Sequence, residues 1–358
     1  MSKIRIGIIG TGGISYVHMS GYKKLADRAE VVAVCDIDEN KVKNYASRHG
    51  VSKYYLDYNE MLAKENLDAV SVTTWNSVHK PATIAALNAG VNVLCEKPMA
   101  LNAQEAMEME EAAKKNNKIL MLGFVRRYGN DTETIKDFID GGFFGDIYYA
   151  KAVYVRRNGC PGGWFGDKSY SGGGPLIDLG VHVMDMTRYL AGCPLPVSAY
   201  GATFSNMGPD RVKDAPVSWA VSSYDASKFV HSVEDFTTAL VRFDNGFTLS
   251  VEASFNLNVK QDYADVELFG TKAGVKIDPE IEIYSDLHSH FVNIQPTLLA
   301  DNSDQNIFDK EMAHFIYCVE NNRQPRSTAH DGVVLMKMID AIYESAKTGG
   351  EVKINWQD

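Results

Sequence analysis

The sequence predicts an α/β protein of two domains: a parallel sheet flanked by helices, then an α+β domain with a large, mainly antiparallel sheet. Up to about residue 123, apolar strand-like runs alternate with helical patterns, as a parallel sheet with crossover helices requires. Beyond that point strand patterns follow one another without intervening helices. At 358 residues the chain is too long for one ordinary hydrophobic core, and its 45% of hydrophobic residues suits a well-buried globular protein. We therefore expect one domain over 1–123 and a second over 124–358.

The elements of the first domain follow from apolar runs bounded by turn residues. Strands are expected near residues 3–9, 30–36, 68–74, 91–95 and 119–123. Helices are expected between them, over ranges such as 39–48, 78–89 and 102–117. Because successive strands are joined by helices, their carboxyl ends should share one edge of the sheet, where ligands of such folds bind.

The second domain shows a different pattern. Strands are expected over 147–157, 197–205, 234–243 and 247–256. Asp244-Asn245-Gly246 lies between the last two and predicts a hairpin turn. Helical patterns over 306–322 and 330–348 close the chain, and we expect this C-terminal part to pack back on the first domain.

Composition limits the function classes. The net charge is −10 and the chain has no basic run, which argues against nucleic acid and anionic membranes as partners. The apolar N-terminal stretch is short and broken by Gly7 and Gly10, unlike a signal peptide, and nothing later approaches a membrane span. Five cysteines at scattered spacings form neither a disulfide framework nor a zinc signature. These observations predict a cytoplasmic protein.

A glycine-rich turn follows the first strand and precedes a helix. Gly10 allows the tight turn, and Gly12 lets backbone N–H groups approach a pyrophosphate at the helix N-terminus. Ser15 stands where the dinucleotide-binding fingerprint usually has Gly or Ala, but its side chain is still small. The pattern predicts a Rossmann dinucleotide-binding domain whose turn residues contact the cofactor, namely Gly10, Thr11, Gly12, Gly13 and Ile14.

Asp36 ends the second strand at the position where this fold carries an acid for the adenosine ribose. Its carboxylate would accept hydrogen bonds from ribose hydroxyls and repel a 2′-phosphate, which favours NAD over NADP. Ile37 follows it and is expected beside the same cofactor group. The alternative is that Asp36 caps the next helix, although Asp38 is equally well placed for that role.

Lys97 lies where the strand near 91–95 leaves the sheet, in the sequence Cys95-Glu96-Lys97-Pro98. Ligands of open α/β sheets bind outside the carboxyl ends of strands. Pro98 disfavours helical geometry at the preceding residue and so keeps Lys97 extended. We therefore expect the lysine to point into the cleft; the alternative is a surface lysine that happens to precede a proline.

A second candidate segment runs from Gly172-Gly173-Gly174-Pro175 into a helical pattern that ends near Leu190. Asp178 and His182 are spaced i and i+4 on this pattern, so the carboxylate would hold the imidazole in one tautomer. A lone histidine is more often structural. A metal site with Asp185 lacks a clear further ligand, and a nearby Lys97 would disfavour a cation, so no metal is expected.

Three stretches of this sequence, GIIGTGGISYVH, AGVNVLCEKPMAL and SGGGPLIDLGVHVMD, resemble the glucose-fructose oxidoreductase, inositol dehydrogenase and MocA (Gfo/Idh/MocA) family. The resemblance spans nearly the whole chain. It implies that Lys97, Asp178 and His182 form the catalytic set: His182 as acid/base on the reacting hydroxyl, Lys97 polarising its oxygen, and Asp178 paired with the histidine.

The same resemblance extends to the turn after the strand near 68–74. The family's Thr-Pro-Asn-like turn is represented here by Thr73-Thr74-Trp75-Asn76. Trp75 replaces the proline and either stacks near the cofactor or fills the cleft wall. We expect further cofactor contacts from this turn and from the lysine segment, namely Thr74, Trp75, Asn76, His79, Glu96 and Lys97.

Substrate contacts are expected from the glycine-rich loop between Arg156 and Gly174 and from the domain junction. Trp164 would stack on the apolar face of a sugar, and arginine or asparagine side chains would donate to its hydroxyls. Each of these residues has an equally good structural alternative. The candidates are Arg126, Arg156, Asn158 and Trp164.

These patterns and the resemblance predict an NAD-dependent oxidoreductase that converts a secondary hydroxyl of a sugar, glycoside or cyclitol to a ketone. The loop from Arg156 to Gly162 resembles family members that oxidise glucosides at C3, which favours that substrate over myo- or scyllo-inositol. Other classes remain open, namely a glycosidase that recycles bound NAD or a non-catalytic dinucleotide-binding sensor, although the retained catalytic set argues against the sensor. A homodimer or homotetramer formed through the second sheet is expected by the same resemblance.

Overall fold

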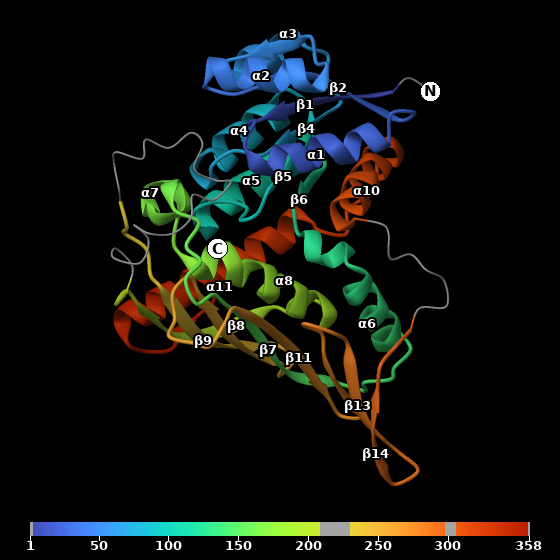
Figure 1. Cartoon of the computed structure of the whole chain (residues 1–358), viewed down its shortest axis with the longest axis vertical. Coiled ribbons are helices and arrows are strands. Elements are labelled where there is room, and N and C mark those ends of the chain that lie inside the picture. The colour runs from blue at the N-terminus through green and yellow to red at the C-terminus, as the bar shows by residue number, and fades with distance from the viewer. Residues whose placement is uncertain (1–2, 208–229, 298–305, 357–358) are drawn as a thin grey trace.

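A computed structural model of the chain describes residues 3–207, 230–297 and 306–356. In these ranges the first domain is a parallel sheet with strand order β3-β2-β1-β4-β5-β6 (Figure 1). This is the order of doubly wound dinucleotide-binding folds, in which the crevice lies where the order reverses, here between β1 and β4. The predicted fold class is confirmed.

The elements of this domain match the expected alternation. Its strands are β1 (Ile4–Ile9), β2 (Ala29–Cys35), β3 (Lys53–Tyr55), β4 (Ala69–Val72), β5 (Asn92–Cys95) and β6 (Leu120–Leu122). Its helices are α1 (Gly13–Lys24), α2 (Glu39–His49), α3 (Tyr58–Lys64), α4 (Asn76–Asn88) and α5 (Ala103–Asn116). The sequence did not indicate β3, since this short edge strand is mostly exposed and has no apolar run.

The second domain is built on a nine-stranded sheet with the order β14-β13-β12-β11-β7-β10-β9-β8-β15. Its strands are antiparallel except for the pair β7 and β10, which run parallel. The four expected strands are present as β7 (Ile147–Val155), β8 (Pro196–Phe204), β9 (Phe236–Phe243) and β10 (Thr248–Ser254). The sheet is extended by β11 (Tyr263–Gly270), β12 (Ala273–Lys276), β13 (Glu282–Leu287), β14 (His290–Ile294) and β15 (Val352–Lys353).

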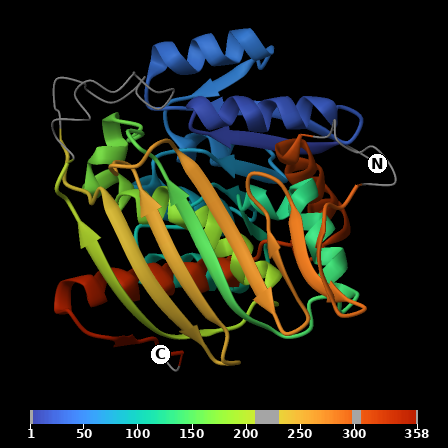
Figure 2. The same ribbon diagram turned by 60° about the horizontal axis from the view of Figure 1, so that its bottom comes forward.

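Helices cover one face of this sheet. The π helix η3 (Leu176–Gly180) and helix α8 (Val181–Leu190) lie between the sheet and the first domain, together with α11 (Ala329–Thr348) (Figure 1). Figure 2 shows the opposite face, where no helix of the described residues stands in front of the strands. The remaining short elements are η1 (Val125–Tyr128), α6 (Asn130–Asp140), η2 (Gly163–Gly166) and α7 (Lys168–Ser171).

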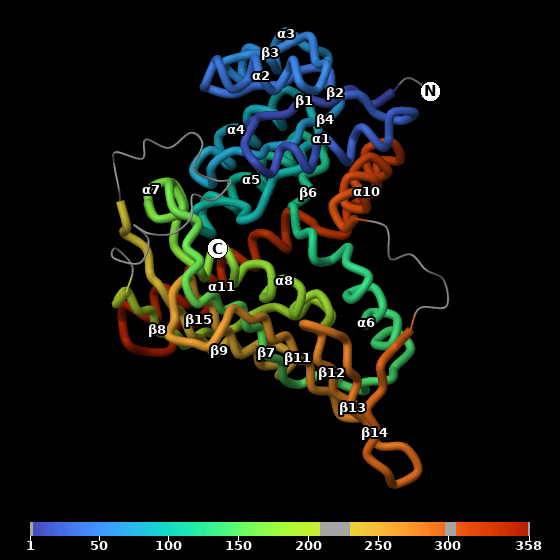
Figure 3. The backbone as a smooth tube through the Cα atoms, viewed as in Figure 1, coloured from blue at the N-terminus to red at the C-terminus, as the bar shows by residue number. Residues whose placement is uncertain are grey.

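The last two helices join the domains. Helix α10 (Ile307–Asn321) lies beside α1, and Met312 and Phe315 share a buried cluster with Ile6 and Tyr22 of the first domain (Figure 3). Helix α11 contacts both α5 and β8. The C-terminal part of the chain therefore spans both sheets, and burial of these apolar side chains holds them together.

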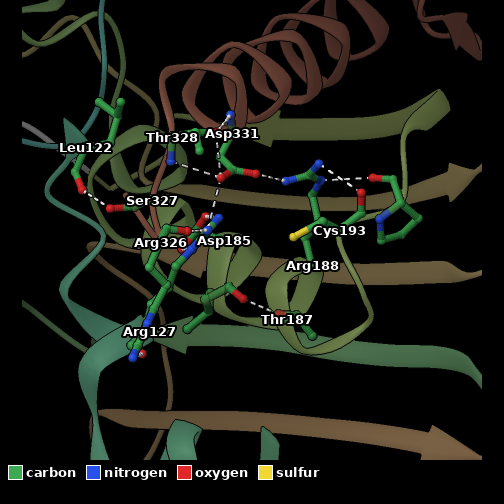
Figure 4. A network of polar contacts seen from close by, with 12 residues as sticks. Leu122, Arg127, Asp185, Thr187, Arg188, Cys193, Arg326, Ser327, Thr328 and Asp331 are labelled. Carbon is green, nitrogen blue, oxygen red and sulfur yellow. Dashed lines mark hydrogen bonds and ion pairs between the residues drawn. The ribbon is translucent and has the colours of Figure 1, made fainter. Parts of the chain in front are cut away.

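Four buried charges at the domain junction hold α8 in place (Figure 4). Arg127 in η1 donates to both carboxylate oxygens of Asp185 in α8, at 2.9 and 2.6 Å. Asp331 in α11 accepts from Arg127 at 3.1 Å and from Arg188 in α8 at 2.8 Å. Burial alone would raise the pKa of Asp331, but the two guanidinium groups hold it well below its usual range. The network ties α8 to η1, which lies at the domain junction, and to α11.

Candidate active site

The glycine turn after β1 has the geometry of a phosphate-binding turn. Gly10 has φ +93°, and a side chain there would lie 2.6 Å from the carbonyl oxygen of Thr73. Only glycine fits both constraints. Helix α1 begins at Gly13, after Gly12 as its N-cap, so the first N–H groups of the helix are available to an anion.

A cavity opens at the carboxyl ends of β1, β2 and β4, and we call it the strand-end cavity. Eight of its lining residues were expected cofactor contacts, namely Gly10, Gly12, Gly13, Ile14, Asp36, Ile37, Thr74 and Trp75. Sequence reasoning missed Lys41, Leu56, Tyr58 and Val78, which also line it. Leu56 and Tyr58 follow β3, so recognising that edge strand would have located them.

Asp36 is held at the cavity wall by neighbouring groups. Its Oδ2 accepts hydrogen bonds from the backbone N–H and the hydroxyl of Thr11, both at 2.8 Å, and lies 3.6 Å from the Lys41 ammonium. Asp38, not Asp36, caps α2, because its side chain accepts from the Lys41 N–H. The alternative role of Asp36 as a helix cap is therefore wrong. The backbone N–H and hydroxyl of Thr11 hold the Asp36 carboxylate in place.

A segment of the second domain contributes to the wall of this cavity. Trp164 in η2 is one of its lining residues, although we expected it to contact a sugar. Asn76 donates to the carbonyl oxygen of Ser171 at 2.8 Å, and the ring of Trp75 meets that of Tyr170 edge to face, with centroids 5.0 Å apart. In the structure, Asn76 therefore anchors this segment rather than lining the cavity.

Two further expected cofactor contacts, His79 and Glu96, are also buried supports. The ring nitrogens of buried His79 lie 2.7 and 3.3 Å from the carbonyl oxygens of Pro98 and Thr74. Glu96 accepts from the buried ring of His18 at 2.9 Å and from the N–H of Lys97 at 3.2 Å. These contacts set the path of the chain on both sides of the lysine.

Lys97 and Asp178 form the centre of the candidate active site. The Lys97 ammonium lies 3.0 Å from the Asp178 carboxylate and 3.2 Å from its carbonyl oxygen. Both side chains are mostly buried, at 18% and 11% exposed. The lysine follows β5, which pairs with β4, so it stands beside the strand-end cavity. The structure thus brings together the two motifs from separate domains.

Among the described residues, the expected hydrogen bond between Asp178 and His182 is absent, and the His182 imidazole has no hydrogen-bond partner. Asp178 lies in the wider π turn of η3, and its carboxylate is engaged by Lys97 instead. An i and i+4 spacing indicates neighbours on a regular α helix, but it does not reveal a competing cation from another domain.

Three positive charges surround His182. Burial lowers the pKa of its imidazole well below the usual range, and the charges of Lys97, Arg126 and Arg156 lower it further. The ring therefore stays neutral over a wide pH range and can accept a proton. Part of its surface remains exposed, as a group that meets a substrate requires.

The remaining substrate candidates are dispersed. Arg126 pairs with Asp278 at 3.0 Å, and Arg156 donates to the carbonyl oxygen of Gly159 at 2.9 Å. Asn158 lines a separate groove with Arg157, Asn258 and Val259, away from the strand-end cavity. Of the four, only the two arginines act on His182 through their charge.

The described residues offer neither a metal-ligand cluster nor a membrane-spanning helix. They contain no group of three or more His, Cys, Asp or Glu side chains arranged to hold a metal ion. Among them we also find no helix with the length and apolar character needed to cross a bilayer.

Comparison with known proteins identifies the family. Residues 4–124 match the model of the oxidoreductase family with an NAD-binding Rossmann fold, and residues 132–276 match the GFO/IDH/MocA C-terminal domain. The chain belongs to the Gfo/Idh/MocA family. It is therefore an oxidoreductase with a dinucleotide-binding domain, as its three motifs indicated.

Similar proteins act on sugars and cyclitols. D-glucoside 3-dehydrogenase of Escherichia coli K12 is 34% identical over 356 residues, covering 99% of this chain and 98% of that protein. The NAD(+)-dependent scyllo-inositol 2-dehydrogenase of Bacillus subtilis 168 is 26% identical, covering 99% and 97%. A structure of levoglucosan dehydrogenase with NADH and levoglucosan has a TM-score of 0.86 at 22% identity, covering 99% and 100%. At that identity the structural match supports the fold.

Proposed function

We propose that this Gfo/Idh/MocA oxidoreductase uses NAD to oxidise a secondary hydroxyl of a sugar or glycoside, with C3 of a glucoside as the preferred position. The observation that carries the chemistry is the Lys97–Asp178 ion pair near His182, at the strand end beside the strand-end cavity. The similarity to D-glucoside 3-dehydrogenase over the full chain supports the substrate class.

The cavity suits a dinucleotide. The glycine turn leaves no room for a side chain at Gly10, and the free N–H groups of α1 suit a pyrophosphate. Asp36 lines the cavity where a ribose would meet it. Bound NAD supplies the hydride acceptor, and the protein supplies orientation and charge.

The side chains perform the proton chemistry. We infer that the substrate hydroxyl donates to His182, whose neutral imidazole accepts the proton as the ketone forms. The Lys97 ammonium donates to the same oxygen and stabilises the negative charge that develops on it. Asp178 holds the lysine in place by accepting from its ammonium group.

The proposal is tested by following NADH absorbance with NAD and a panel of glucosides, free sugars, inositols and sugar phosphates. We expect the largest rate with a glucoside, and product analysis should place the ketone at C3. A larger rate with an inositol would contradict the proposed substrate class. No NADH from any compound, in protein shown to bind NAD, would favour a glycosidase that recycles its cofactor.

The pH dependence of oxidation should report His182. Because its pKa is lowered, the neutral base persists in mild acid, so the acid limb of kcat/KM should lie below the usual histidine value of about 6.5. Replacing Arg156 with methionine removes one nearby positive charge and should move this limb upward. An acid limb above about 6.5 in the natural enzyme would contradict the assignment.

Cofactor preference should depend on Asp36. In Asp36→Ser the negative charge facing a 2′-phosphate is lost while Lys41 remains, so kcat/KM for NADP relative to NAD should rise at least about tenfold. Asp38→Ser is the matched control: serine can still cap α2, so the variant removes only a negative charge two residues away and should leave the ratio unchanged. A natural enzyme that prefers NADP would refute the role of Asp36.

We also propose that the uncovered face of the second sheet forms the contact between subunits. Tyr200 of β8 and Leu240 of β9 are cross-strand partners in this sheet and are 54% and 44% exposed. Neighbouring exposed apolar side chains of this kind suit a protein interface. Light scattering should give the mass of a dimer or tetramer; a monomer would contradict this part of the proposal.

A further inference from the structure

Glu234 contacts the segment that leads into the candidate catalytic helix. Its Oε2 accepts from the N–H of Gly174 at 3.0 Å, and its Oε1 accepts from the N–H of Leu176 at 3.3 Å. Pro175 lies between them and has no N–H. One buried carboxylate, 7% exposed, therefore satisfies both backbone donors at the start of η3.

Tyr343 in α11 fixes this carboxylate from the other side. Its hydroxyl donates to Glu234 Oε1 at 2.8 Å. A side chain at Gly173 would lie 2.1 Å from that hydroxyl, and one at Gly174 would lie 2.4 Å from the Glu234 carbonyl oxygen. The glycine run before Pro175 is therefore required by the close approach of two residues distant in sequence.

One turn of the chain connects the Glu234 contact at Gly174 to Asp178. The N–H of Asp178 donates to the carbonyl oxygen of Gly174 at 3.1 Å, so the residue held by Glu234 also holds Asp178. Asp178 in turn accepts from the Lys97 ammonium through both its carboxylate and its carbonyl oxygen. A shift of this turn would move Asp178 and Lys97 together.

We propose that Glu234 is a positioning residue for the oxidation: with Tyr343, it sets the start of η3 so that Asp178 holds Lys97 at the reacting oxygen. This inference rests on the proposed function. It assigns Glu234 no contact with substrate or cofactor, and it predicts a defect in the chemical step rather than in cofactor binding.

The test compares Glu234→Gln, Tyr343→Phe and Glu344→Gln, the last being an exposed glutamate of the same α11 helix. The probe is methyl β-D-glucoside with and without deuterium at C3. We expect Glu234→Gln to lower kcat about 100-fold and to raise the deuterium isotope effect, with NAD affinity and thermal midpoint nearly unchanged. Tyr343→Phe should give a smaller loss and Glu344→Gln none. Unchanged kcat, or a loss that tracks falling NAD affinity or thermal midpoint, would overturn the proposal.

A second measurement needs no turnover and so separates this inference from the proposed function. The NMR signal of the Lys97 ammonium, assigned by its loss in Lys97→Met, should shift in Glu234→Gln and stay in place in Glu344→Gln. If the natural enzyme oxidises no glucoside, the proposed function fails while this readout still tests Glu234. An unmoved Lys97 signal in Glu234→Gln would overturn the positioning role.

Discussion

Replacing Lys97 with methionine is expected to lower kcat for oxidation by about 10²–10³-fold, the usual cost of removing one donor to a developing oxyanion. In the proposed mechanism the Lys97 ammonium donates to the reacting oxygen, and methionine keeps much of the side-chain length without the charge. Among the described residues, those that line the strand-end cavity do not include Lys97. Its replacement should therefore change the KM for NAD little. Steady-state kinetics with the best substrate of the panel measures both.

The controls separate charge from disruption. Lys97→Arg keeps a positive charge but presents it in a planar fork, so we expect partial activity. Lys115→Ala removes an exposed lysine of α5 and should have no effect. Full activity of Lys97→Met would show that the proposed mechanism is wrong. A loss explained wholly by weaker NAD binding would show that Lys97 contacts the cofactor and does not act on the reacting oxygen.

Replacing Asp185 with alanine is expected to cost about 3–5 kcal/mol of unfolding free energy, the usual result of removing one partner of a buried ion pair. Arg127, whose side chain is 1% exposed, would keep its contact with Asp331 but lose two hydrogen bonds to Asp185. Its charge would then be only partly compensated. Calorimetric unfolding should show a clear fall in the thermal midpoint.

A double variant tests the physical cause. Arg127→Met with Asp185→Leu removes both charges, and it should recover part of the stability lost in Asp185→Ala because no uncompensated guanidinium remains. Asp137→Ala, at an exposed position of α6, is the matched control and should change the thermal midpoint little. A double variant less stable than Asp185→Ala would show that the pair itself is strongly favourable.

Much of the fold follows from local pattern. The alternation of apolar strands and helices predicted the parallel sheet, and the glycine turn with Asp36 predicted where a dinucleotide would bind. Lys97 was expected in the cleft from its place after β5, and the structure puts its ammonium on Asp178 from the second domain. The fold was predictable because period, turn residues and strand ends are properties of short segments, whereas the cofactor contacts and the role of Lys97 stay predictions.

The contacts that the sequence did not predict share one cause. Asp178 was expected to pair with His182 but contacts Lys97, and Asn158 was expected near the substrate but lines another groove. Asn76 and Glu96 were expected at the cofactor but support neighbouring segments. In each case a partner distant in sequence determines what the side chain contacts.

The sequence by itself determined the class of protein: two domains, a dinucleotide-binding turn and the motifs of one oxidoreductase family. Only the tertiary structure decided that Glu234 and Tyr343 hold the start of η3, that Asp185 ties α8 to Arg127 of η1, and that Trp164 lines the strand-end cavity. Local periodicity is set by backbone geometry, whereas these contacts arise when packing brings distant segments together and buried polar groups must find partners.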